Sequence, residues 1–268
     1  MIQVDTLCHK IQNFVEKAKR AGVTRVFIGL ENINPDNLTA AKKHQNKITE
    51  YRKMLLAWKA QGIITLAGYI LGFPSDTPET IRRDIAIIQE ELPLDVIEFF
   101  CLTPLPGSED HQVLWKKGVA MDPDLNTYDV EHVCTAHPKM SKQEWEDIYR
   151  EAWSLYYTPK HMKTLLRRAA ATGVPMGSLV KVLVTFATTV RLENVHPLQS
   201  GILRSKRPSE RRPGLPRENP WIFWSRYAWE TLSKHAIFAG AIVRLLLTAI
   251  AISHAPAART NSASALTN

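Results

Sequence analysis

The sequence predicts an α/β protein, namely a partial parallel (β/α) barrel with a helical C-terminal extension. Short, continuous apolar runs alternate with segments that are long enough for helices. Each run ends in a loop rich in glycine, proline and carboxylate residues. The order strand, helix, strand, helix, strand requires right-handed crossovers and a parallel sheet. In such sheets the functional loops lie at the carboxyl ends of the strands.

The first elements are a helix, a strand and a second helix. Apolar residues recur at helical spacing over residues 7–21, and Gly22 is a suitable residue to terminate that helix. Residues 26–30 are apolar throughout, which is typical of a strand buried on both faces. A polar loop over residues 32–37 separates this strand from a helix over residues 50–60.

Two further strands and one helix complete the alternating pattern. Residues 63–71 form the second apolar run, and residues 95–102 form the third. Between them, Thr77 and Pro78 have the composition of a helix start, with a capping hydroxyl followed by proline in the first turn. This helix ends before Pro93.

The chain becomes mainly helical after the third strand. Ser141 and Glu144 have the spacing of a capping box. An apolar and aromatic face follows at residues 145–156, and we interpret it as core packing rather than as a platform for stacking bases. Pro159 is suited to open a further helix, and residues 176–190 predict another.

The composition divides the chain into three parts. Its 268 residues suit one large domain or two small ones, and the 45% hydrophobic and 22% charged residues exclude a disordered, collagen-like or coiled-coil protein. Residues 197–268 hold 10 of the 34 basic residues but only three of the 26 acidic ones. We therefore expect a partial barrel at 1–125 and a helical extension at 126–196. Residues 197–268 would supply a basic linker, an apolar helix and a disordered tail.

The basic C-terminal quarter leaves several roles open. Residues 204–217 form either a solvated linker or a contact to an anionic partner such as lipid or RNA. Residues 236–253 are almost wholly apolar, but Arg244 lies at their centre. A central arginine disfavours a membrane span, so a buried or interfacial helix is the preferred interpretation and a span is the alternative. We expect a cytoplasmic location, with any membrane association through residues 236–253.

Three cysteines, Cys8, Cys101 and Cys134, lie far apart in the sequence. Their odd number and wide spacing predict no disulfide framework and favour a reducing compartment. They form no CxxC or CxxxCxxC motif, so the sequence predicts no metal site.

The three strand ends carry the most specific signal. They read FIGLEN at residues 27–32, GYILGFPSDT at residues 68–77 and LTPLPGS at residues 102–108. In this order and spacing they resemble the later half of the radical S-adenosylmethionine core, in the branch associated with a cobalamin-binding domain. The resemblance is strong over about residues 20–110 and continues through Tyr157.

The resemblance implies an S-adenosylmethionine site at these strand ends. Its cofactor-binding residues would be Glu31, Gly68, Gly72, Asp76, Leu102 and Thr103. Glu31 would make a polar contact to the cofactor, the two glycines would let the backbone approach the adenine, and the backbone at residues 102–103 would flank it. Two alternatives stay open: Glu31 pairs with Lys42 or Lys43, and Asp76 serves the N-terminus of the following helix.

Members of that family also hold a 4Fe–4S cluster on a CxxxCxxC loop, which this sequence lacks. We therefore expect a truncated protein that retains part of the nucleoside half-site, cannot bind the cluster alone and has no catalytic residues of its own. A separate chain would supply the missing N-terminal half. The alternative is a non-enzymatic protein that binds membranes or nucleic acid through its basic C-terminal quarter.

Overall fold

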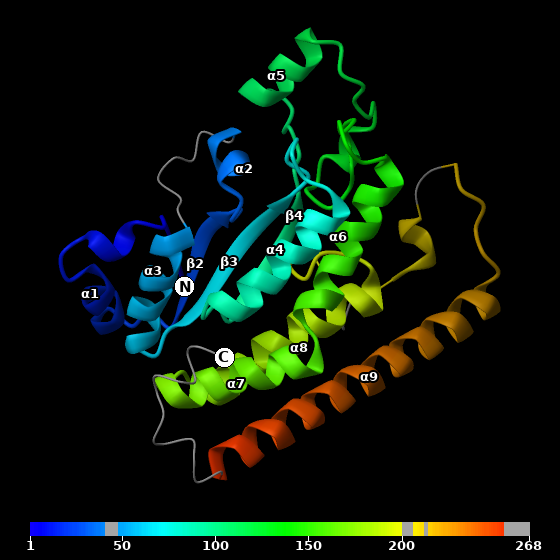
Figure 1. Ribbon diagram of the computed structural model, residues 1–268. Coiled ribbons are helices and arrows are strands. Elements are labelled where there is room, and N and C mark those ends of the chain that lie inside the picture. The colour runs from blue at the N-terminus through cyan, green and yellow to red at the C-terminus, as the bar shows by residue number, and fades with distance from the viewer. Residues whose placement is uncertain (41–47, 200–205, 212–213, 255–268) are drawn as a thin grey trace.

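The computed structural model describes residues 1–40, 48–199, 206–211 and 214–254. At its centre is a parallel sheet of four strands in chain order (Figure 1). The strands are β1 (Ile2–Val4), β2 (Arg25–Glu31), β3 (Ile64–Leu71) and β4 (Val96–Cys101). The predicted α/β class with a parallel sheet is confirmed, and β1 adds a short strand that the sequence analysis did not anticipate.

Helices connect the strands and cover one face of the sheet. The connecting helices are α1 (Phe14–Arg20), α2 (Pro35–Ala40), α3 (Ile48–Ala60) and α4 (Pro78–Glu91). Alternate residues of β2 point into the core beneath these helices and are fully buried, whereas Phe27 and Gly29 lie on the opposite face and are half-buried. In a closed barrel this second face would line the interior.

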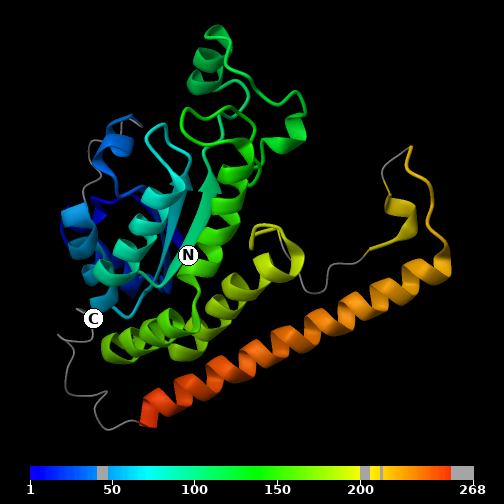
Figure 2. The ribbon, with the colours of Figure 1, turned by 45° about the vertical axis from the view of Figure 1, so that its right-hand side comes forward.

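A helical layer follows the sheet (Figure 2). Its helices are α6 (Lys142–Tyr156), α7 (Pro159–Thr172) and α8 (Met176–Glu193), whereas α5 (Glu109–Lys116) stands apart beyond the carboxyl end of the sheet. The described residues also contain three 3-10 turns, η1 (Cys8–Lys10), η2 (Leu125–Thr127) and η3 (Pro208–Glu210). The capping box of Ser141 and Glu144 opens α6 as predicted, and the aromatic face of α6 is buried. Trp153 and Tyr156 pack edge-on against Phe99 of β4, which joins this layer to the sheet.

The two edge strands of the sheet differ in how their outer backbone groups are hydrogen-bonded. At β4, the Tyr157 hydroxyl donates to the Ile97 carbonyl at 2.7 Å and accepts from the Ile97 N–H at 3.1 Å. The Cys101 N–H donates to the Val130 carbonyl at 2.7 Å. At the other edge, β1 is three residues long and pairs with no strand except β2 in the described part of the chain. The β1 edge is therefore the open one.

A buried ion pair lies near the amino ends of β3 and β4. The Lys59 ammonium contacts the Asp95 carboxylate, and both side chains are almost fully buried. Asp95 also accepts from the Thr65 N–H at 2.9 Å and from the Thr65 hydroxyl at 3.1 Å. Each charge is thus paired and hydrogen-bonded, as a buried ion pair requires.

Two local predictions were wrong, and one predicted helix is longer than expected. The helix expected over residues 7–21 begins only at Phe14, because Asn13 takes a left-handed conformation with φ of 55°. The loop expected over residues 32–37 contains the start of α2, where Asn34 accepts from the Asp36 N–H at 3.0 Å and acts as a cap. The apolar helix expected over residues 236–253 is part of a longer helix, α9 (Pro220–His254). The disordered tail expected after it lies outside the described residues.

Candidate functional site

The carboxyl ends of β2, β3 and β4 bring the sequence-predicted site residues to one edge of the sheet. Glu31 lies beside Tyr69 in the pairing of β2 with β3. The Leu102 N–H donates to the Leu71 carbonyl at 2.8 Å, so the residues after β4 continue alongside β3. Five of the six residues therefore lie at or after three neighbouring strand ends, as the parallel order requires, whereas Gly68 lies within β3, three residues before its end.

Glu31 takes a strained backbone conformation at the end of β2. Its φ is 65°, and the register of β2 against β3 shifts between Gly29 and Glu31. Its Oε1 atom lies 3.2 Å from the position that a Cβ on Gly29 would occupy, so the carboxylate folds back over the sheet face. The side chain is half-buried. Lys42 and Lys43, its alternative partners, lie outside the described residues.

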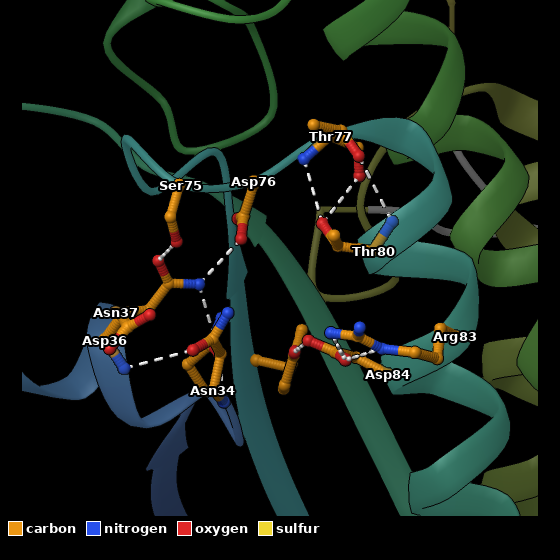
Figure 3. A network of polar contacts seen from close by, with 11 residues as sticks. Asn34, Asp36, Asn37, Ser75, Asp76, Thr77, Thr80, Arg83 and Asp84 are labelled. Atoms are coloured by element: carbon orange, nitrogen blue, oxygen red, sulfur yellow. Dashed lines mark hydrogen bonds and ion pairs between the residues drawn. The ribbon is translucent and has the colours of Figure 1, made fainter.

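Asp76 holds the loop after β3 in place. Its carboxylate accepts from the N–H groups of Gly72 at 2.9 Å and Phe73 at 3.0 Å, and from the Asn37 amide at 2.6 Å. Figure 3 shows Asn37 reaching from α2 to Asp76 and to the neighbouring Ser75. Burial raises the pKa of Asp76, while these hydrogen bonds oppose the rise. The cap of α4 is Thr77, so the Asp76 carboxylate turns toward the strand end instead.

The two glycines make room for aromatic rings. At Gly72 φ is 102°, and an added Cβ would lie 1.8 Å from the Trp145 indole of α6. The indole Nε1 donates to the Leu71 carbonyl at 3.3 Å. An added Cβ on Gly68 would lie 3.1 Å from ring atoms of both Phe27 and Phe100. Side chains of this protein thus occupy the space over both glycines.

Leu102 and Thr103 leave part of their surface accessible. Both residues are half-buried. The Thr103 hydroxyl donates to the Cys101 carbonyl at 3.0 Å, which fixes the backbone as it leaves β4. Together with Glu31, this segment is the part of the predicted site that keeps accessible surface in the described structure.

Sequence reasoning missed Glu98, a buried carboxyl group on the sheet. Gly29, Gly68 and Glu98 are paired across β2, β3 and β4, so they lie on the same sheet face. Glu98 is only 3% exposed, and its Oε2 atom has no hydrogen-bond partner within the described structure. Burial raises the pKa of Glu98 to about 7. The signal was present, since a single acidic residue interrupts the apolar sequence of β4.

The donor set does not fit an iron–sulfur cluster. Cys8 lies in η1, which packs on α3, whereas Cys101 ends the edge strand β4. Burial raises the pKa of both thiols and of Cys134. A cluster needs several thiolates that converge on one point. Within the described residues, no group of three histidine, cysteine or acidic side chains is arranged to hold a metal ion.

His132, His137 and His161 each contact other groups of the protein. The His161 ring packs on Tyr156 at 4.6 Å between centroids, and burial lowers its pKa to about 3. His137 Nε2 donates to the Phe73 carbonyl at 2.9 Å, next to Trp145. His132 pairs at the surface with Asp129 at 2.8 Å.

Comparisons with known proteins give distant relatives. The chain is 28% identical over 102 residues to bacteriochlorophyllide d C-12(1)-methyltransferase of Chlorobaculum tepidum. This aligned region covers 36% of this chain and 22% of that protein. It is also 27% identical over 165 residues to an uncharacterized methyltransferase of Pyrococcus horikoshii. This aligned region covers 58% of this chain and 34% of that protein. The chain thus spans about a third or less of these relatives. No protein-family model matches it.

A search of solved structures finds Elp3 of the archaeon Methanocaldococcus infernus, in a form with an N-terminal deletion. The match has a TM-score of 0.40 and 14% sequence identity. It covers 59% of this chain and 46% of Elp3.

Proposed function

We propose that this chain carries part of an S-adenosylmethionine site and acts with a further segment that completes it. The observation that carries the proposal is that Glu31 ends β2 while Leu102 and Thr103 follow β4, on either side of β3 at the carboxyl end of the same sheet. The strand-end motifs that resemble the radical S-adenosylmethionine core contain these residues, and both sequence relatives are methyltransferases by name. The substrate stays unassigned.

The residues at this edge divide into two roles. Glu31 would accept from ribose hydroxyls or from the ammonium group of the cofactor, because a carboxylate is an acceptor-only group. The backbone of Leu102 and Thr103 would flank the base. Asp76 and Gly72 are positioning residues, since the first holds the β3 loop and the second admits the Trp145 ring.

Binding of the cofactor to the chain alone tests this proposal. We expect weak, saturable binding of S-adenosylmethionine and S-adenosylhomocysteine, with a Kd on the order of 1 mM, because one half of a site provides few contacts. Amide chemical-shift changes in ¹⁵N-labelled protein should concentrate at Glu31, Leu102 and Thr103. Methionine alone should cause none of these changes at the same concentration.

Two variants make the test specific. Glu31→Gln should weaken binding at least fivefold, whereas Glu90→Gln, on the exposed surface of α4, should leave it unchanged. Absence of shifts at these strand ends at about 5 mM ligand, several times the expected Kd, would refute the proposal. Equal losses in the two variants would also refute it.

We further infer that a 4Fe–4S cluster, if one serves this site, is held by another segment or chain. The cluster would supply the electron that cleaves S-adenosylmethionine reductively, which ordinary side chains cannot supply. Anaerobic incubation of the purified chain with iron and sulfide should leave no bound cluster after desalting. A stoichiometric, redox-active brown product would overturn this inference.

A further inference from the structure

The most exposed apolar surface of the described structure lies on α9. This helix has 35 residues, and its most apolar 18-residue window has a mean hydropathy of 2.2 with 17% of it buried. Length and composition alone would let it cross a membrane, which is weak evidence by itself. In Figures 1 and 2 it is the outermost helix, below α7 and α8, and its N-terminal half extends beyond them.

Seven of the exposed apolar side chains of α9 share one side of the helix, whereas the exposed Trp224 and Ile237 lie outside that arc. We name these seven the outer row: Trp221, Trp229, Leu232, Val243, Leu246, Leu247 and Ile250. At 100° per residue they fall within about 100° of the helix circumference. The side chains buried against α7 and α8, namely Leu245, Ala249 and Ile252, lie nearly opposite. The outer row therefore has no cover within the described residues.

Aromatic residues gather at the N-terminal end of this row. Trp221 is 84% exposed, Trp224 is 50% exposed and Trp229 is 74% exposed. Tyr227 and Phe223 stack beside them. Tryptophan and tyrosine favour the boundary between water and lipid, because each combines an apolar ring with a polar group. This end of α9 has the composition of a membrane-interface anchor.

Positive charge borders the outer row. Arg226 and Arg244 are 18 positions apart, so they lie at the same angle on the helix, beside the outer row. Their long side chains can reach lipid phosphates while the row stays in an apolar phase. Lys206, Arg207 and Arg226 line a cavity of about 470 Å³ at the start of α9 together with Glu210 and Glu218, and the Arg226 guanidinium pairs with Glu218 at 2.7 Å. Since the C-terminal quarter carries net positive charge, an anionic surface complements it.

We propose that α9 lies flat on an anionic bilayer surface, with the outer row in the boundary between headgroups and acyl chains. A crossing orientation conflicts with the packing of Leu245, Ala249 and Ile252 in the protein core. The Lys234 ammonium of α9 also forms an ion pair with the Glu193 carboxylate of α8, at a distance of 3.7 Å. The helix is about 52 Å long, well beyond the roughly 30 Å of hydrocarbon in a bilayer. RNA would use the arginines but would leave the apolar row uncovered.

Vesicle co-sedimentation of the full chain tests the proposal. We expect binding to phosphatidylcholine vesicles containing about one third phosphatidylserine, and at least tenfold weaker binding to phosphatidylcholine alone, because anionic lipid attracts the arginines. Leu232→Gln/Leu247→Gln should weaken binding at least tenfold. The matched control is Leu125→Gln/Leu198→Gln, which removes two equally exposed leucines from elsewhere and should have no effect. Unchanged circular dichroism should show that each variant folds.

Three outcomes would overturn the proposal. One is the absence of vesicle binding by the folded chain. Another is a dimer in light scattering that the outer-row variant alone dissociates, since a second copy would then cover the row. The last is binding to RNA that Arg226→Gln/Arg244→Gln abolishes, with vesicle binding that is insensitive to the outer-row variant.

Discussion

Replacing Glu98 with glutamine tests whether the sheet face really buries a carboxyl group. In the folded chain the pKa of Glu98 is about 7, against an ordinary value of 4.5. Between these two values the folded chain keeps the proton and the unfolded chain releases it, so stability falls as the pH rises. One pKa unit corresponds to about 1.4 kcal/mol, and the full cost above pH 7 is therefore about 3 kcal/mol. Most of that cost is absent at pH 5.

Denaturant unfolding of the wild type and Glu98→Gln at pH 5 and pH 8.5 measures this cost. The variant should gain about 2–3 kcal/mol relative to the wild type between the two pH values, because glutamine does not ionise. Any constant penalty for burying the amide cancels in this comparison. Glu90→Gln, at an exposed position, should show no such gain. If the difference between wild type and Glu98→Gln is the same at both pH values, the reasoning from burial fails.

Three further predictions concern packing and the open edge. Lys59→Met should lower the free energy of unfolding by about 3–5 kcal/mol, because it leaves the Asp95 charge buried without its partner. The double variant Lys59→Met/Asp95→Leu should regain most of this lost stability. A double variant as unstable as Lys59→Met would contradict this prediction. Gly72→Ala should lower the free energy of unfolding, measured by thermal or chemical denaturation, by about 2–4 kcal/mol. The added Cβ would overlap the Trp145 indole, and the residue has a positive φ that alanine disfavours. An unchanged stability would mean that the indole moves aside. Size-exclusion chromatography with light scattering should show association through the β1 edge, and a monomer with a cooperative unfolding transition would count against it.

The sequence predicted the alternating core of the fold because its signals are local. Thr77 followed by Pro78 marks the start of α4, and the same chemistry at Asn34 and Pro35 marks α2. The second signal is weaker, because the helix that follows it in the described residues has only six residues. The break before Phe14 had no comparable signal, since the apolar spacing continues across Asn13.

The candidate site was predictable in its position and less so in its detail. Parallel order alone places the three strand ends at one sheet edge. The Trp145 indole fills the space over Gly72, although the two residues are far apart in the sequence. No local sequence pattern predicts such a contact. The Asn37 bond to Asp76 is likewise a tertiary contact. The three-part domain division stays a prediction.

The Tyr157 hydroxyl has a consequence for how this sheet can grow. By occupying both backbone groups of Ile97, it takes the place that a fifth strand would use beside β4. Strand addition can therefore proceed in one direction only, outward from β1. A strand added to this sheet would therefore dock next to Ile2, Gln3 and Val4.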